Sequence, residues 1–214
     1  MSTENQRDQL ISYFTLRVLI GASGILLPLL LVLGKLIYQC EWLVEDSISD
    51  YYDNGTAGDI LVGVLFVLGF FLFSYHGFNS TDDLFANLGG IFALGVALFP
   101  TTAEGIVHVL HFVFASSLFI VFVIFSVYLF RKSDIPKEQH QREKKLRNRI
   151  YLWCGIIMIA CIVSIFVSSV FFGEAAVKCN LLFWFESVAL ITFGISWLTK
   201  SEKFYLKDKP AVQT

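Results

Sequence analysis

Six long runs of apolar residues dominate the sequence, and short polar stretches separate them. The runs cover residues 18–37, 57–75, 84–99, 105–130, 150–172 and 181–199. Apolar side chains fill each run continuously, without the 3.6-residue alternation of a soluble amphipathic helix. A helix needs about 20 apolar residues to cross the hydrocarbon core of a bilayer, and it satisfies its own backbone hydrogen bonds there. The pattern therefore predicts an all-α, polytopic membrane protein with a bundle of six transmembrane helices.

The basic residues predict how this bundle is oriented. All of the 16 Lys and Arg residues except Lys35 and Lys178 fall within residues 1–17, 131–149 and 200–214. An even number of spans places these three segments on the same side of the membrane. Because Lys and Arg favour the cytoplasmic side, we expect both tails and the basic 131–149 loop to be cytoplasmic. The predicted plan is an N-terminal tail, a transmembrane domain over 18–199 and a C-terminal tail, in a cell membrane of the bacterial inner-membrane type.

The composition agrees with this interpretation and excludes several classes of protein. Of the 214 residues, 56% are hydrophobic and only 16% are charged, whereas a soluble domain carries about 25% charged residues. A soluble enzyme, a nucleic-acid binder and a disordered chain are all disfavoured. The expected partner is the lipid bilayer, with no nucleic acid, and the oligomeric state stays open.

Small residues predict which helix is central. Gly89, Ala93 and Ala97 form a small-xxx-small ridge in the third run, and such ridges allow close contact between membrane helices. Gly21 and Gly24 make a weaker version in the first run. We therefore expect the third helix to lie in the middle of the bundle.

Two cysteines fall near the predicted outer surface. Cys40 follows the first run and Cys179 precedes the sixth. In an oxidising compartment they could form a disulfide, and the alternative is two free thiols, because nothing in the sequence shows that their Cα atoms are close.

Ionisable residues inside the predicted spans are the main candidates for function, since such groups are expensive in a membrane. His108 and His111 lie in the fourth run and Glu186 in the sixth. With a rise of about 1.5 Å per residue, His108 lies about 5 Å below the outer end of its helix, and His111 and Glu186 each about 9 Å. All three therefore belong to one slab of the outer leaflet.

These groups, with Ser49, Asp50 and Asp53 of the acidic outer loop, could form a metal site or a structural polar network. Residues three apart share a helix face, so His108 and His111 can face one ion. Two imidazoles and one or two carboxylates are a workable zinc shell with an open position for water. A structural His–Glu pair that joins the fourth and sixth helices is the first alternative, and a proton relay is the second.

A series of motifs resembles a bacterial family of small six-helix membrane proteins of unknown function. The series consists of Ser47-Ile48-Ser49-Asp50, the second helix, Phe99-Pro100, and His108 with His111. The resemblance covers about residues 15–130 and implies six helices. It points to the same residues as the depth estimate and implies no particular activity.

A more distant resemblance is to the membrane-embedded metal hydrolases that include alkaline ceramidases, which combine a serine, an aspartate and three histidines around zinc. This sequence departs from them in having His-x-x-His rather than His-x-x-x-His, six spans rather than seven, and a site at the outer face.

The first of three hypotheses for this integral membrane protein is a membrane-embedded hydrolase of a lipid-type substrate. A zinc ion held by His108 and His111 would activate water, Asp50 or Glu186 would complete the shell or act as base, and Ser49 would help to hold an oxyanion. A small transporter or channel subunit with a path along Glu186 and the histidines is one alternative. A non-catalytic membrane scaffold, in which the same residues are structural, is the other.

Overall fold

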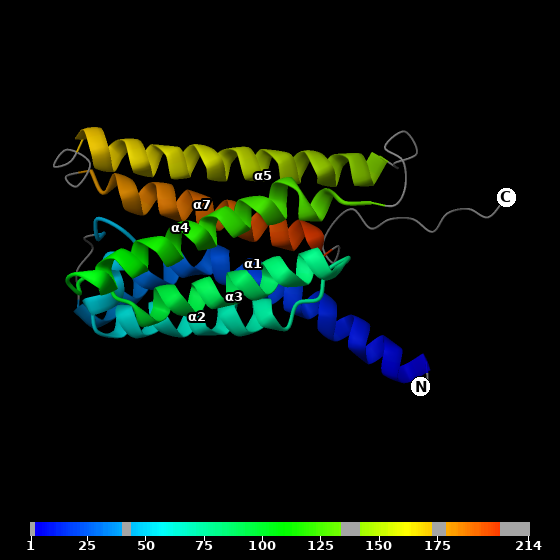
Figure 1. Ribbon diagram of the computed structural model, residues 1–214. Coiled ribbons are helices and arrows are strands. Elements are labelled where there is room, and N and C mark those ends of the chain that lie inside the picture. Colours follow the sequence, from blue (N-terminus) through cyan, green and yellow to red (C-terminus); the bar gives the residue numbers. More distant parts are fainter. Residues whose placement is uncertain (1–2, 40–43, 134–141, 173–178, 202–214) are drawn as a thin grey trace.

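The computed structural model describes residues 3–39, 44–133, 142–172 and 179–201, with side chains from Phe14 onward (Figure 1). The part of the chain described is helical and contains no strand. Its elements are α1 (Thr3–Gln39), the 3₁₀ helix η1 (Ser49–Asp53), α2 (Thr56–Phe73), α3 (Ser80–Leu98), α4 (Ile106–Val127), the 3₁₀ turn η2 (Leu129–Arg131), α5 (Arg142–Val167), the π-helical turn η4 (Ser168–Phe172) and α7 (Leu181–Lys200).

Among the residues that the structure describes, six segments are long and apolar enough to cross a membrane, which confirms the predicted all-α, six-helix fold class. They are Phe14–Gln39, Thr56–Phe73, Ser80–Leu98, Ile106–Arg131, Arg142–Phe172 and Leu181–Lys200. The protein is therefore a multi-pass membrane protein.

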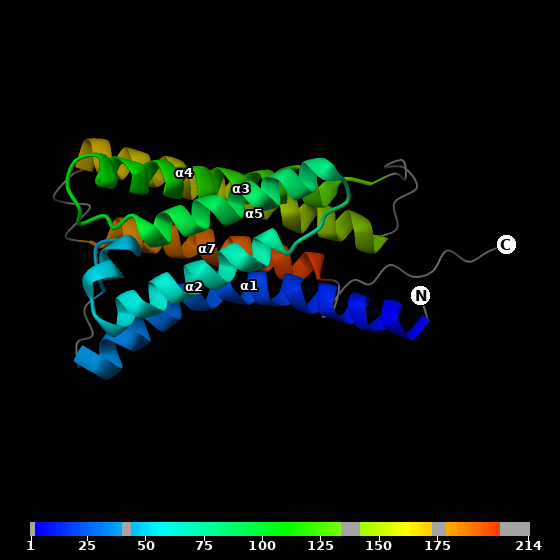
Figure 2. The same cartoon turned by 60° about the horizontal axis from the view of Figure 1, so that its bottom comes forward.

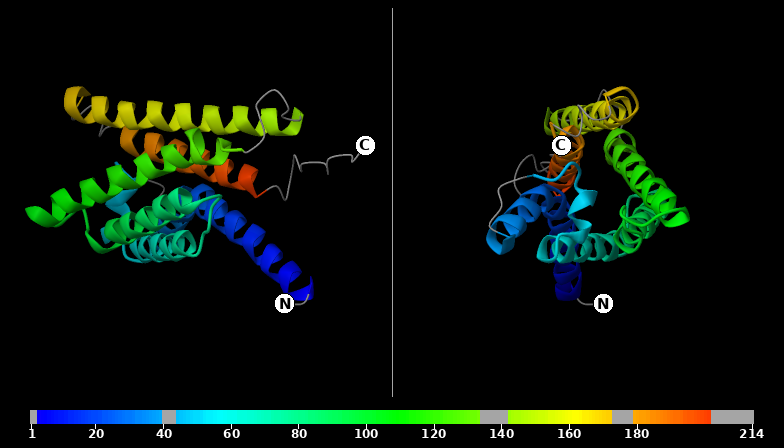
Figure 3. Two further views of the ribbon diagram at one scale, coloured as in Figure 1. Left: turned by 45° about the vertical axis from the view of Figure 1, so that its right-hand side comes forward. Right: turned by 90° about the vertical axis from the view of Figure 1, so that its left-hand side faces the viewer.

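The six long helices form a ring in chain order. Each packs against the next, and α7 also packs along α1, so that the first and last helices close the bundle (Figure 2). The helix α5 lies along α4 and α7, away from α2 and α3 (Figures 1 and 3).

Two helices begin well before the apolar runs that predict them. The helix α1 starts at Thr3, within the predicted tail, and its first turns project beyond the other helices (Figure 1). The helix α5 starts at Arg142, within the predicted basic loop. Apolar residues mark the part of a helix that lies in hydrocarbon, whereas Arg, Lys, Glu and Gln are good helix formers that extend it into water.

The start of α3 also differs from the prediction. Residues 80–83 precede the apolar run at 84–99, yet they form the first turn of the helix. The cap is Asn79, whose side-chain oxygen accepts a hydrogen bond from the amide of Asp82 at 3.3 Å. Asp82 itself is buried and pairs with Lys132 at 2.6 Å, which ties the first turn of α3 to the segment after η2.

Among the glycines of the described long helices, the closest approach between the backbones of two long helices lies between α1 and α7 rather than on the predicted ridge of α3. A Cβ atom added to Gly194 would lie 2.4 Å from the carbonyl oxygen of Gly21, and one added to Gly24 would lie 2.9 Å from that of Leu190. On α3, Gly89 meets side chains of its neighbours at 3.2 Å or more. Backbone therefore approaches backbone more closely at the ring closure than between α2 and α3, where a Cβ atom on Gly69 would lie 3.2 Å from the carbonyl oxygen of Gly90, and small residues permit such contacts.

The two ends of the transmembrane domain lie at the same end of the bundle. The guanidinium of Arg17 donates a hydrogen bond to the carbonyl of Lys200 at 3.1 Å, and the left panel of Figure 3 shows the start of α1 and the end of α7 pointing the same way. The predicted cytoplasmic location of that end stays a prediction.

We expect Gly194→Ala to lower the stability of the bundle by about 3 kcal/mol, the upper part of the range for overpacking, because the new methyl group meets backbone that cannot rotate away. Thermal unfolding of the protein in detergent measures this. Gly63→Ala is the matched control, because a Cβ atom there meets nothing within 4 Å. Equal unfolding temperatures for the two variants would contradict the role of the glycine crossing.

Candidate functional site

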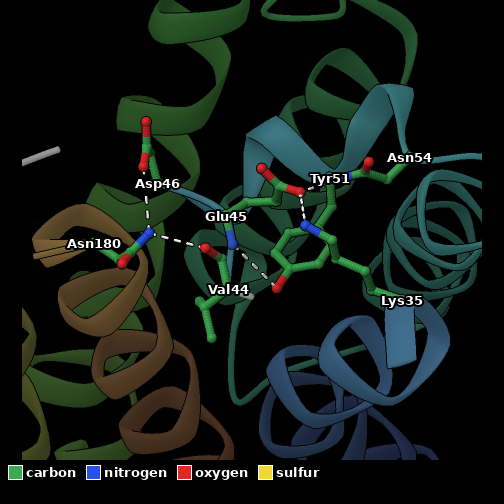
Figure 4. A network of polar contacts seen from close by, with 7 residues as sticks. All are labelled: Lys35, Val44, Glu45, Asp46, Tyr51, Asn54 and Asn180. Carbon is green, nitrogen blue, oxygen red and sulfur yellow. Dashed lines mark hydrogen bonds and ion pairs between the residues drawn. The ribbon is translucent and has the colours of Figure 1, made fainter. Parts of the chain in front are cut away.

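An irregular segment covers one end of the helix ring. This capping segment, residues 44–55, follows α1, contains η1 and leads into α2. Its connection to α1 runs through the buried ammonium of Lys35, which pairs with the carboxylate of Glu45 (Figure 4). Glu45 also accepts a hydrogen bond from the Asn54 side chain at 2.7 Å, and its own amide donates to the Tyr51 hydroxyl at 3.4 Å. Glu45 thus connects both ends of the capping segment to α1.

The other anchor of the capping segment is the start of α7. The side-chain amide of Asn180 donates to the carbonyl of Val44 at 2.9 Å and to the carboxylate of Asp46 at 3.2 Å (Figure 4). Asn180 has a φ of 47°, a left-handed conformation that asparagine tolerates better than most residues. The amide of Phe183 donates to the carbonyl of Asp46 at 2.9 Å.

Glu186 holds the middle of the capping segment. Its half-buried carboxylate, one turn farther along α7, accepts a hydrogen bond from the backbone amide of Ile48 at 2.6 Å. Ser49 is the next residue, so the carboxylate fixes the backbone that carries the Ser49 hydroxyl. Glu186 therefore contacts the predicted site through the backbone amide of Ile48.

The α3–α4 connection supplies the third side of the site. Phe99 is extended, as a residue before proline prefers, and ends α3 at Leu98. Gly105 has a φ of 67°, which glycine adopts without strain, and α4 starts directly after it. The carbonyls of Phe99 and Thr101 between these two points are free of helix bonding, and the histidines of α4 bind them.

His111 connects the α3–α4 connection to the capping segment. Its ring is buried, with 2% of the residue exposed. The Nδ1 atom lies 2.6 Å from the carbonyl oxygen of Phe99, and Nε2 lies 3.0 Å from the hydroxyl oxygen of Ser49. Because a carbonyl only accepts, Nδ1 carries the ring proton, and the lone pair of Nε2 is directed at the Ser49 hydroxyl.

His108 has a different environment. Its exposed ring lies with Nδ1 2.6 Å from the carbonyl of Thr101, and the Thr101 hydroxyl in turn donates to the carbonyl of Ser49 at 3.3 Å. The two histidines thus bind separate carbonyls of one connection.

These bonds bear on the predicted zinc site. No group of three His, Cys, Asp or Glu residues is placed to hold a metal ion among the residues that the structure describes. The Nδ1 atoms of both histidines face carbonyls, and the carboxylate of Glu186 faces an amide. The described residues therefore give the zinc shell expected from His108, His111, Asp50 and Glu186 no support, and that site stays a prediction.

Asp50 lies beside Ser49 in η1, and its carboxyl group is half-buried. Burial raises the pKa of this carboxyl above its ordinary value of 3.8, and the nearby charges of Asp46 and Glu45 raise it further. Hydrogen bonds with Ser47 act in the opposite direction. The amide of Asp50 donates to the Ser47 hydroxyl at 3.2 Å, so Asp50 is held within its own turn.

A small cavity adjoins Ser49 inside the ring. Its volume is about 50 Å³. Ser49 and Glu186 contribute the polar side chains among the residues that line it, and the other lining residues are Leu27, Ile48, Leu61, Leu65, Val96, Ala115, Leu118, Phe119 and Leu190. The Ser49–His111 pair therefore lies where an apolar space inside the bundle meets its polar cap.

Comparisons with protein-family models, with curated proteins and with solved structures find no match for this chain. The resemblances described from sequence motifs therefore stay predictions. The suggested pairing of Cys40 with Cys179 also stays open, because Cys40 lies outside the described residues, and Cys179 is exposed.

Loss of one partner of the Lys35–Glu45 pair is expected to destabilise the protein. Because Lys35 is buried and Glu45 is partly exposed, we expect Lys35→Met to cost about 1–3 kcal/mol, between the values for exposed and buried pairs. Thermal unfolding of Lys35→Met, Glu45→Gln and the double variant measures this. The double variant is expected to lose less stability than the two single variants lose together. If the two losses of stability simply added up, Lys35 and Glu45 would not interact directly.

The pH dependence of stability tests the environment of Asp50. Because its folded pKa is raised, the folded state binds the proton more tightly, and stability falls as the pH rises above 3.8 through the folded pKa. Asp50→Asn removes this cost, so we expect a higher unfolding temperature than the parent at pH 7 and no difference below pH 3.8. Asp53→Asn is the control for loss of one exposed carboxylate in the same turn. An Asp50→Asn variant that is less stable at pH 7 would refute this.

Proposed function

We propose that this protein is a membrane-embedded hydrolase of a lipid-type acyl ester, with Ser49 as nucleophile and His111 as general base. The observation that carries the proposal is the chain of contacts from the Ser49 hydroxyl to His111 Nε2 at 3.0 Å and from His111 Nδ1 to the Phe99 carbonyl at 2.6 Å. A nucleophile, a base and a third group that orients the base are the elements of an activated serine.

The geometry supports a two-step reaction. The Ser49 oxygen attacks the ester carbonyl carbon while its proton passes to Nε2 of His111. The bond to the leaving alcohol then breaks, and the alcohol takes that proton, which leaves an acyl group on Ser49. Water attacks this acyl group, gives its proton to His111, and the acid leaves as the serine regains its hydrogen.

The surroundings of His111 suit this role. In both steps the imidazole becomes positively charged for a short time, and the Phe99 carbonyl accepts the Nδ1–H bond of that cation. A carbonyl stabilises the cation less than the carboxylate of a Ser-His-Asp triad would. Glu186 acts as a positioning residue in this scheme, because its bond to the Ile48 amide fixes the backbone next to Ser49.

The position of the pair supports a substrate from the membrane. His111 lies in the second turn of a membrane-spanning helix, and the exposed His108 precedes it at the helix start. A group at this depth meets ester bonds near a bilayer surface. The basic residues at the opposite end of the bundle support an outward-facing capped end in a bacterial inner membrane.

The packing below the cavity favours a hydrolase over a transporter. Toward the other end of the bundle, Phe122 of α4 stacks on Phe193 of α7 with ring centroids 3.7 Å apart. One turn farther, the buried hydroxyls of Ser126 and Ser196 bond to each other at 2.7 Å. A transport path along Glu186 would have to pass this contact.

The test uses the purified full chain in detergent, with ester hydrolysis and labelling by a serine-reactive fluorophosphonate as readouts. We expect Ser49→Ala to abolish both, and His111→Gln to lower the rate by about 10²–10⁴-fold, the usual contribution of a general base. His108→Ala is the matched control and is expected to keep most of the activity, because its ring binds a different carbonyl.

Thermal unfolding and zinc analysis of the same samples separate the alternatives. A stable Ser49→Ala variant that still hydrolyses esters would refute the serine mechanism. Near-stoichiometric zinc that is lost with His108 and His111 would restore the metal hypothesis. Variants that lose only stability, with no activity in the parent, would favour the scaffold.

A further inference from the structure

We propose that the cavity below Ser49 is the acyl pocket and that it limits the substrate to esters of short acyl chains, of about two to four carbons. The inference rests on the proposed function, because it takes Ser49 as the residue that receives the acyl group. It adds the class of acyl group that the enzyme accepts.

The first argument is position. Ser49 and its neighbour Ile48 line the cavity together with Glu186, and every other lining side chain is apolar. An ester carbonyl attacked by Ser49 would therefore have an apolar space on the bundle side and the polar capping segment on the other. The acyl part suits the apolar side, and the alcohol part stays at the capped end.

The second argument is size. The cavity has a volume of about 50 Å³, whereas an engineered protein cavity that binds benzene measures about 150 Å³. The cavity has about a third of that volume, which is room for about two carbon atoms. An acetyl or propionyl chain fits, and butyryl fits with small side-chain movements. The chain of a membrane phospholipid, several times longer, does not, so the lipid part of a lipid-type substrate would belong to its alcohol.

The third argument is that the cavity does not extend farther along the bundle axis. Each helix contributes lining residues from only one or two turns, such as Leu61 and Leu65 of α2 or Ala115, Leu118 and Phe119 of α4. One turn below, the stacked Phe122 and Phe193 fill the space between α4 and α7. A longer chain would have to displace buried side chains of a closely packed interior.

The experiment measures kcat/KM of the purified full chain for p-nitrophenyl esters with acyl chains of 2, 4, 8 and 12 carbons. We expect the two shortest esters to react best and the eight-carbon ester to react at least about tenfold more slowly, since one surplus methylene already costs about tenfold or more in a fixed pocket. A parent that prefers the eight- or twelve-carbon ester would overturn the inference.

Two variants change the pocket in opposite directions. Leu118→Ala enlarges it and is expected to raise the eight-carbon to two-carbon ratio about tenfold. Ala115→Leu fills it and is expected to lower the four-carbon rate more than the two-carbon rate, which keeps the test available if the first variant does not fold. Leu98→Ala, at an exposed leucine of α3 outside the pocket, is the matched control and leaves the profile unchanged.

The outcomes separate the two proposals. Ser49-dependent hydrolysis with a chain-length profile that neither pocket variant alters would overturn the acyl pocket and leave the hydrolase. Absence of Ser49-dependent hydrolysis for every ester would overturn the proposed function and the pocket with it.

Discussion

Irregular backbone beside a bilayer has to find partners for its own amides and carbonyls, because each unsatisfied group costs several kcal/mol there. In this protein, ionisable side chains at the ends of helices supply several of those partners. Glu186 accepts from the Ile48 amide, His111 binds the Phe99 carbonyl and His108 binds the Thr101 carbonyl. The costly groups inside the spans therefore have a structural task before any chemical one.

The contact between His111 and Ser49 is not needed to satisfy the backbone. His111 would satisfy the Phe99 carbonyl with Nδ1 alone, yet its second nitrogen meets the Ser49 hydroxyl inside the ring. The first bond fixes the tautomer that makes the second nitrogen a base. The imidazole of His111 thus has both a structural and a proposed chemical role. Its bond to the Phe99 carbonyl leaves Nε2 free of a proton, and Nε2 can then accept the proton of Ser49.

The sequence predicted the six helices because continuous apolar runs of this length have few other interpretations in a chain so poor in charge. It predicted their ends less well. Hydrophobicity indicates only the part of a helix that lipid surrounds. The polar first turns of α1 and α5 extend these helices beyond the lipid, so the apolar runs do not mark where the helices begin. The closest glycine crossing was underestimated, since the tight contact of Gly21 requires Gly194 on a helix that is distant in sequence.

For the site, the depth of His111 and Glu186 followed from the helix rise, and the structure brings both to neighbouring residues of the capping segment. The acceptors of the histidine bonds could not be predicted in the same way. Every residue carries a carbonyl, and nothing in a side-chain pattern marks those of Phe99 and Thr101 as unpaired. The Phe99-Pro100 step, which ends a helix, was the available signal. The partners of Lys35 depend on how the capping segment folds back, which sequence spacing does not give.

The closure of the ring by its first and last helices has a consequence for biogenesis. Helices α1 to α5 contact their chain neighbours and can assemble as they enter the membrane, but the α1–α7 crossing joins residues that are far apart in sequence. Contacts of such long range form late and depend on the rest of the chain. Until α7 arrives, Ile48 lacks its carboxylate partner and the cavity lacks the wall made by Leu190. The cavity beside Ser49 is therefore complete only after α7 has joined the other helices.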